Sequence, residues 1–219
     1  MSIILLLLLV TLSAGPHSAE STAIRSNPYF PTNNGTVLVF ESSFGESTTT
    51  YSLDGEYTIS SSESDRFKYR QKLIVTEDGI YAKETYQYFK IFLFVKQEAT
   101  LTYGKPLLRF PLPLSPGVTW KWEGEECSNG DTNRVKVSGK ALENEFVETK
   151  AGRFEAIKIE TLVEGVSTSK RNRVTEWYAK GVGLVKIKIE IDGGGVMGIL
   201  RDLLGYGKIE SELKEIRRQ

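Results

Sequence analysis

Residues 185–191 alternate between apolar and charged side chains. The apolar positions are Val185, Ile187, Ile189 and Ile191, and the positions between them are Lys186, Lys188 and Glu190. A period of two places these sets on opposite faces of a β-strand, with the apolar face toward a core. Shorter stretches at residues 134–138 and 157–160 repeat the pattern. All three are predicted to be strands with one polar face.

Between Tyr29 and Ile191, stretches rich in Val, Ile, Thr, Tyr, Phe and Trp are separated by short groups of Gly, Asn, Asp and Ser. This composition is typical of strands joined by turns. Candidate turns lie at residues 53–56, 77–79, 128–131 and 150–152. Most gaps are too short for a crossover helix, so the strands are expected to be antiparallel. The sequence predicts a mainly β fold, either one curved antiparallel sheet or an incomplete barrel.

The segment after residue 192 has a different pattern. Three glycines interrupt the alternation, and apolar residues then recur at helical spacing. They are Val196, Ile199, Leu200, Leu203, Leu204, Ile209, Leu213 and Ile216. Glu210 and Lys214 form an i,i+4 pair that favours a helix. We predict a C-terminal amphipathic helix over about residues 196–217, packed on the sheet. A hinged lid or a membrane-surface helix is the alternative, although the balanced charges lack the basic face typical of the latter.

Two stretches of the chain resemble each other. Residues 30–41 and 110–123 each open with Phe-Pro and continue through a Gly into an aromatic-bearing strand that ends in Glu. Each is followed by a Tyr-Ala-Lys triplet, at residues 81–83 and 178–180. An internal duplication would build the sheet from two related halves, and chance similarity between β segments is the alternative.

The chain begins with an apolar run from Ile3 to Leu12, the length of a signal-peptide core and too short to cross a bilayer. Small residues follow, although no Lys or Arg precedes the run. We predict a signal peptide over residues 1–19, with the cut after Ala19 or Ala23, and a single β-rich domain over residues 20–219. The mature chain is expected to be extracytoplasmic, secreted or periplasmic, with no transmembrane span.

Charge and residue counts narrow the function classes. The chain has 28 basic and 28 acidic residues, so no net field favours nucleic acid as a partner. Cys127 is the single cysteine, which excludes an intramolecular disulfide and the acylated cysteine of a bacterial lipoprotein. His17 is the single histidine and precedes the predicted cut. The mature chain therefore offers no Ser-His-Asp or Cys-His arrangement and no zinc site built on Cys and His.

Carboxylates are the remaining candidates for acid–base chemistry. Glu123, Glu125, Glu126 and Asp131 surround Cys127, but a solvated turn explains this cluster more simply than a hydrolytic pair or a calcium site. We therefore expect no enzymatic activity, no metal and no cofactor.

Aromatic residues gather in residues 86–94 and again in the second half of the chain. On a strand, Tyr88 and Phe92 share one face, as do Trp120 and Trp122. A packed core is one interpretation, because aromatic side chains dominate burial in β domains. The other is an apolar cavity between the sheet and the helix. The residues predicted to bind a ligand there are Tyr88, Phe92, Trp120, Trp122 and Trp177.

Three runs of fold-forming residues lie within residues 106–190. They are Phe110-Pro111 with Gly117, Trp120 and Trp122; Ala151-Gly152-Arg153-Phe154; and Glu176-Trp177-Tyr178-Ala179 with Gly181-Val182-Gly183-Leu184-Val185. This set resembles a family of poorly characterised exported bacterial β-domain proteins. They are similar in fold to the lipoprotein-carrier group, in which an incomplete barrel wraps an apolar cavity closed by helices. The resemblance implies that architecture and no catalytic residues.

Together these features predict a non-enzymatic extracytoplasmic β domain that binds a lipid or other hydrophobic small molecule in a cleft between sheet and helix. The alternative is a structural or assembly module that contacts another envelope protein.

Overall fold

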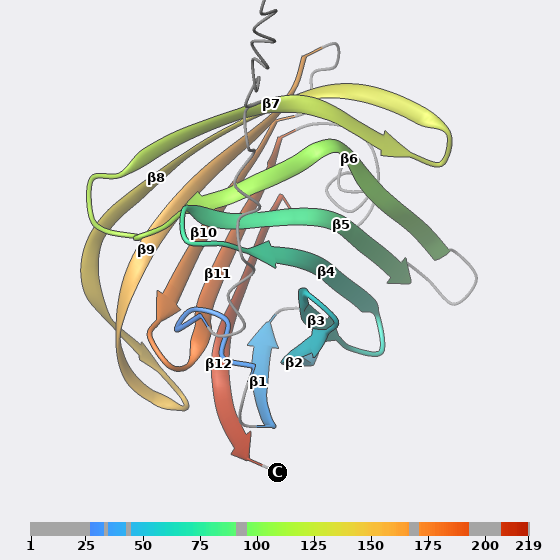
Figure 1. Cartoon of the computed structure of the whole chain (residues 1–219). Coiled ribbons are helices and arrows are strands. Elements are labelled where there is room, and N and C mark those ends of the chain that lie inside the picture. Colours follow the sequence, from blue (N-terminus) through green and yellow to red (C-terminus); the bar gives the residue numbers. More distant parts are fainter. Residues whose placement is uncertain are drawn as a thin grey trace, which may run out of the picture.

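The computed structural model describes residues 27–32, 35–42, 45–90, 96–166, 171–192 and 207–218. These residues form twelve antiparallel strands that close into a barrel (Figure 1). Each strand pairs with its neighbours in sequence, and β1 pairs with β12 to complete the ring. The strands are β1 Thr36–Ser42, β2 Gly45–Asp54, β3 Tyr57–Glu63, β4 Phe67–Val75, β5 Gly79–Lys90, β6 Lys96–Pro111, β7 Thr119–Ser128, β8 Asp131–Thr149, β9 Gly152–Gly165, β10 Arg171–Ala179, β11 Gly183–Asp192 and β12 Lys208–Arg218.

The C-terminal segment is a strand, so the predicted incomplete sheet with a C-terminal helix is wrong. β12 pairs with β11 on one side and with β1 on the other. Ile209 and Leu213 are four residues apart, and this spacing fits one face of a strand as well as one face of a helix. Residues 196–206 of the predicted helix lie outside the described residues.

Glu210 and Lys214, which the helical spacing would pair with each other, form ion pairs with neighbouring strands. Glu210 pairs with Lys186 of β11, and Lys214 pairs with Glu46 of β2. Without β12, the facing edges of β1 and β11 would carry rows of backbone groups that have no partner in the protein, and an added strand pairs them along their length. This requirement outweighs the helical spacing of the apolar residues.

The structure confirms the predicted strands but not the predicted division of the sheet into two related halves. The antiparallel arrangement is confirmed, and the alternating residues 185–191 lie in β11. The two proposed halves do not correspond strand by strand: β1 to β4 lie between Phe30 and Tyr81, whereas β7 to β9 lie between Phe110 and Tyr178. The predicted signal peptide, residues 1–19, lies outside the described residues. Within the described residues, no helix is long and apolar enough to span a membrane.

One end of the barrel is plugged by the segment Asn27–Phe30. The rings of Tyr29 and Phe30 lie 5.5–6.4 Å, centroid to centroid, from those of Phe110 and Tyr178. The backbone N–H of Gly181 donates to the carbonyl of Pro28 at 2.7 Å, which fixes the segment to the β10–β11 turn. We call this the plugged end. The opposite end, which carries the β3–β4 and β7–β8 turns, is the far end.

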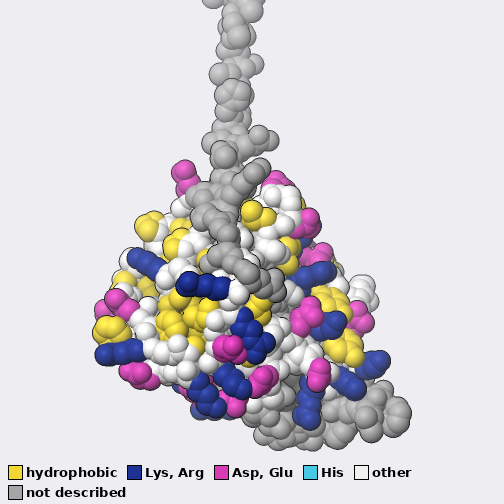
Figure 2. All heavy atoms as spheres, turned by 90° about the horizontal axis from the view of Figure 1, so that it is seen from below, with side chains coloured by type: hydrophobic (Ala, Val, Ile, Leu, Met, Phe, Trp, Pro, Cys, Tyr) yellow, Lys and Arg dark blue, Asp and Glu magenta, His cyan; other side chains and the backbone are white. Residues whose placement is uncertain are grey.

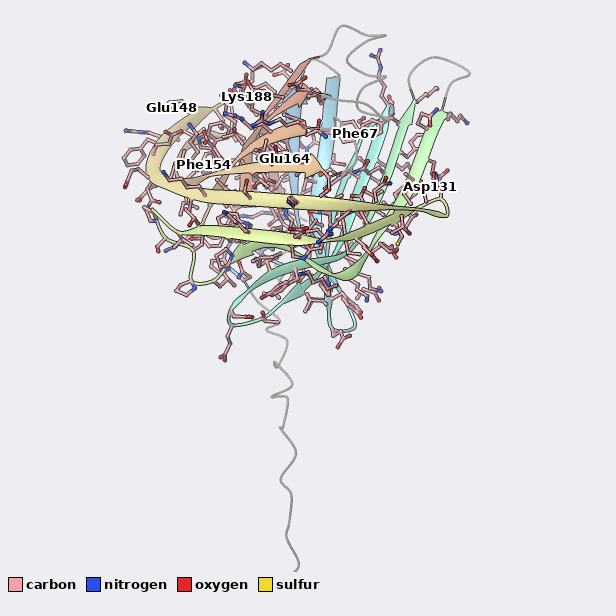
Figure 3. The ribbon with its side chains drawn as sticks, turned by 90° about the horizontal axis from the view of Figure 1, so that it is seen from above. Phe67, Asp131, Glu148, Phe154, Glu164 and Lys188 are labelled. Carbon is pink, nitrogen blue, oxygen red and sulfur yellow. The ribbon has the colours of Figure 1, made fainter. Side chains whose placement is uncertain are left out.

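The β8–β9 hairpin extends beyond its neighbours and packs against β11 and β12. Figure 3 shows Asp131 and Glu148 at opposite ends of β8, with Phe154 of β9 near the hairpin tip. The N–H of Ala151 donates to the carbonyl of Leu213, and Lys150 pairs with Glu41. β11 and β12 pair only over residues 186–190 and 208–212, so the tip contacts the region where they diverge. A second apolar cluster forms there from Val147, Ala156, Trp177, Val185 and Leu213, among others.

Two tryptophans on β7 occupy space inside the barrel that neighbouring glycines leave free. Trp120 lies directly opposite Gly139 of β8, and a Cβ built at Gly139 would come within 2.2 Å of the indole ring. A Cβ at Gly124 would likewise come within 2.5 Å of the Trp122 ring. The inward position of both rings therefore depends on the absence of a side chain at these glycines.

We expect Gly139→Ala to destabilise the protein by about 1–3 kcal/mol, because the added methyl overpacks against Trp120. Urea unfolding followed by circular dichroism measures the change. Gly104→Ala on β6 is the matched control, since its Cβ would meet only an ordinary contact at 3.7 Å. Combining Gly139→Ala with Trp120→Phe should restore part of the loss, and equal stability of the two alanine variants would contradict the packing argument.

Candidate functional site

An ion pair crosses the interior of the barrel between β6 and β10. Nη2 of Arg109 donates to both carboxylate oxygens of Glu176, at 2.7 and 2.9 Å, and Nη1 donates to Oε1 of Gln71 at 3.2 Å. The side chains of Arg109 and Glu176 are only 17% and 8% exposed. Two opposite charges are thus held largely out of water, where each needs the other.

A β-bulge places Arg109 in the interior. Ile80 of β5 pairs with Phe110, but the next residue, Tyr81, pairs with Leu108, so Arg109 is the extra residue. Adjacent residues of a regular strand face opposite sides of the sheet, and a bulge relaxes this rule. Arg109 and Phe110 consequently both reach inward, one into the ion pair and the other into the plugged-end cluster.

Hydrogen bonds extend the pair into a polar layer that joins β4, β5, β6 and β10. The Tyr178 hydroxyl donates to Glu176 at 3.0 Å, and Nε2 of Gln71 donates to the Thr85 hydroxyl at 3.4 Å. The Tyr103 hydroxyl donates to the same Thr85 oxygen at 3.3 Å. We call Gln71, Thr85, Tyr103, Arg109, Glu176 and Tyr178 the polar layer.

The arginine and the two tyrosines of the polar layer have raised pKa values. Burial lowers the pKa of Arg109, but the attraction of Glu176 outweighs this and raises the net pKa. Burial, reinforced by the Glu176 carboxylate, raises the pKa of Tyr178, and burial raises the pKa of Tyr103. These shifts move away from neutral pH, so the three groups stay protonated there and do not serve as general bases.

Beyond the polar layer, inward-facing side chains toward the far end are only half-buried. Register places Val163, Val174, Ile187 and Ile189 on the inner face of β9 to β11, and Phe67 and Phe89 on that of β4 and β5. Each is intermediate in exposure rather than buried. Figure 3 labels Phe67, which pairs with Phe89 at 6.4 Å between ring centroids. Inward side chains near the strand ends meet water at the barrel rim as well as through the interior, so solvent reaches the part of the interior next to the far end.

The structure separates the residues predicted to bind a ligand. Trp120 and Trp122 face inward, but each is buried in a different packed cluster. Trp177 lies on the opposite face of β10 from Glu176, and its Nε1 donates to Glu145. Tyr88 lies on the outer face of β5, opposite Lys68 and Glu98. Phe92 lies outside the described residues. A binding role for these five residues remains a prediction.

Sequence reasoning missed the polar layer. Arg109 is a single charge within the run Leu107-Leu108-Arg109-Phe110-Pro111, and Glu176 directly precedes Trp177-Tyr178. A charge within an apolar or aromatic run is a signal for a buried partner, because an unpaired buried charge is costly. The identity of the partner was not readable, since the two residues are 67 positions apart.

Two shallow depressions on the outer surface are poorer candidates for an apolar ligand. One, of about 310 Å³, is lined mainly by Glu41, Ser42, Lys150, Glu210 and Glu212. The other, of about 340 Å³, is lined by Lys140, Glu143, Glu145 and Lys158 together with Gly117, Ala141 and Leu142. Neither includes a tryptophan. In Figure 2, which views the molecule from below, basic and acidic side chains likewise alternate around small hydrophobic patches.

A family model described as DUF3108-like matches residues 125–190. The match lies inside the stretch whose motifs resemble exported bacterial β-domain proteins, and it covers less than half of the chain. It includes the end of β7, all of β8 to β10 and most of β11, and thus Glu176 and Tyr178 but not Arg109. No curated protein matches the chain significantly.

Two solved structures are similar to the whole barrel at a low level. One is a candidate lipoprotein from Parabacteroides distasonis, with 12% identity and a TM-score of 0.44, covering 89% of this chain and 100% of that one. The other is a candidate exported protein with a YmcC-like fold from Bacteroides fragilis, with 14% identity and a TM-score of 0.44, covering 86% and 98%. Similarity at this level carries no argument about function. Similarity to the lipoprotein-carrier group is not found, and the closed barrel differs from the helix-closed incomplete barrel which that comparison implied.

Removing one member of the buried ion pair should destabilise the protein strongly. We expect Arg109→Met and Glu176→Leu each to cost about 3–5 kcal/mol, because each leaves an unpaired buried charge. The double variant should cost at least about 1 kcal/mol less than the sum of the two. Urea unfolding of the four proteins measures this coupling.

The exposed pair Arg153–Glu148, with side chains 59% and 75% exposed, is the control. The same cycle there should give a coupling below about 1 kcal/mol. Strict additivity at Arg109 and Glu176 would show that the interior pair is not energetically coupled.

Stability should fall at alkaline pH. The pKa of Tyr178 is raised by burial, so above about pH 10 the unfolded chain releases a proton that the folded protein keeps, and unfolding becomes easier as pH rises. Below pH 10 this contribution to stability is fully present. We expect the urea midpoint of Tyr178→Phe to fall less steeply between about pH 9 and pH 11 than that of the unaltered protein. Tyr88→Phe, on the outer face, is the control, and identical slopes for the unaltered protein and Tyr178→Phe would refute the assignment.

Proposed function

We propose that the protein is a non-enzymatic, extracytoplasmic β-barrel that binds a small hydrophobic molecule in the far-end half of its interior. The single observation that carries the proposal is that the inward-facing side chains between the polar layer and the far end are only half-buried. A barrel whose interior is only packed would bury these side chains fully, as it does those at the plugged end.

The composition of these half-buried side chains supports an apolar ligand. Val163, Val174, Ile187 and Ile189 supply aliphatic surface from one wall, and Phe67 and Phe89 supply aromatic surface from another. Small-molecule sites are typically concave and mostly apolar, with a few polar groups that fix orientation. The polar layer supplies such groups at the inner limit of the space.

The extracytoplasmic location rests on the apolar run at the start of the chain and its following small residues. The non-enzymatic character is supported by the polar layer, where the pKa shifts of arginine and tyrosine move away from neutral pH.

The alternative of an assembly module is supported by Phe146, which is 61% exposed near the β8–β9 tip, with the Arg153 guanidinium 4.1 Å from its ring centre. The interior is favoured because its half-buried side chains are more numerous and enclosed.

Filling the interior tests the proposal. Val174→Trp adds a large inward side chain on β10, whereas Arg173→Trp adds the same side chain at the adjacent outward, exposed position. We expect a fluorescent alkyl-chain probe to bind the unaltered protein and Arg173→Trp, and to bind Val174→Trp at least about tenfold more weakly. Native mass spectrometry of the purified protein provides a second measurement, because a retained apolar molecule should be lost from Val174→Trp alone. Equal binding by all three proteins would refute an interior site.

A further inference from the structure

The charges inside the barrel restrict the chemistry of a ligand's polar head. Among the charged side chains that face inward on the described strands are Arg109, Glu176 and Glu126. Arg109 and Glu176 neutralise each other through two hydrogen bonds. Glu126 lies opposite Tyr103 of β6 and Asn133 of β8 and is half-exposed. The Arg109–Glu176 pair at the inner limit of the space is therefore polar but carries no net charge.

An ionised head would be disfavoured at the polar layer. A carboxylate would compete with Glu176 for Arg109 and would be repelled by Glu176, because both would lie on the same guanidinium. An ammonium group would compete with Arg109 for Glu176 and would be repelled by Arg109. Each would leave one buried charge without a full partner, which costs several kcal/mol in a protein interior. A neutral head needs only hydrogen bonds, so it avoids this cost.

Neutral hydrogen-bonding groups surround the same level of the barrel. Gln71 and Thr85 belong to the polar layer, and inward-facing hydroxyls continue along β2 and β3 at Thr49, Ser60 and Ser62. Thr49 and Ser62 hydroxyls bond to each other at 2.7 Å. Burial raises the pKa of Tyr69 as well as that of Tyr103, so both remain hydroxyl donors at neutral pH. These groups can exchange hydrogen bonds with an alcohol or an amide without a change of charge.

We propose that the barrel interior selects a neutral amphiphile, a single alkyl chain with a hydroxyl or amide head. The head lies against Gln71, Arg109 and Glu176, and the chain runs toward the far end between β9 to β11 and β4 to β5. The five residues from Arg171 to Thr175 separate the polar layer from the far end of β10, about 17 Å at 3.3 Å per residue, which accommodates a medium-length alkyl chain. This inference rests on the proposed binding function and names its ligand class.

Three probes with one chain length test the inference. Dodecanol, dodecanoic acid and dodecylamine are titrated into the full mature protein at about pH 8, where the acid is ionised and the amine is charged, and each displaces the fluorescent alkyl-chain probe. We expect dodecanol to bind at least about tenfold more tightly than either charged analogue. Tightest binding by the acid or by the amine would overturn the inference while leaving interior binding intact. Binding by none of the three would overturn the proposed function itself.

Changing the charge of the polar layer provides a second test. Glu176→Gln keeps the size of the side chain and leaves Arg109 with an uncompensated positive charge, so dodecanoic acid should gain at least about tenfold relative to dodecanol. Glu164→Gln is the matched control, because Glu164 faces outward on β9 and pairs with Arg171. The probe preference should not change in this control. An unchanged preference in a folded Glu176→Gln protein would place the head elsewhere and overturn the inference. If Glu176→Gln does not fold, the comparison of probes on the unaltered protein decides alone.

Discussion

The pairing of β1 with β12 is the constraint on which the rest of the structure depends. It joins residues 36–42 to residues 211–218 and turns a sheet with two edges into a ring with none. Closure gives the strands an inside, where the Arg109–Glu176 pair, the tryptophans of β7 and the plug at Asn27–Phe30 all lie. It also satisfies the backbone groups that an open sheet would present to other chains.

Local periodicity was a good guide to the β class and a poor guide to closure. The alternation in residues 185–191 specified a strand because every second position agreed. In β12, Ile209 and Leu213 fit both periods, and the i,i+4 pair of Glu210 and Lys214 favoured the wrong one. The deciding information was the presence of two distant unpaired edges, which no window of neighbouring residues contains. Closed barrels are therefore harder to recognise than their individual strands.

The candidate site was less predictable than the fold. Alternation correctly placed Trp120 and Trp122 on one face, but it could not show that Trp177 faces away from the interior or that Tyr88 lies outside. The polar layer was missed because a bulge sets the direction of Arg109, and a bulge leaves no clear mark in the sequence. What the sequence did contain was the anomaly of single charges within apolar runs. Such charges, rather than the abundant aromatic residues, mark the positions of the polar layer in the sequence.

The contact of the β8–β9 tip with β12 bears on the order in which the protein folds. Ala151 and Lys150 come from the middle of the chain, whereas Glu41 and Leu213 come from near the ends of the described residues. Hairpins such as β2–β3 and β4–β5 close short loops and can form early, but the contacts between tip, β1 and β12 require long loops to close. We expect the barrel to remain an open, curved sheet through most of folding and to become cooperative only when these late contacts form. We therefore expect the junction that seals the folded ring to set the slow step of its assembly as well.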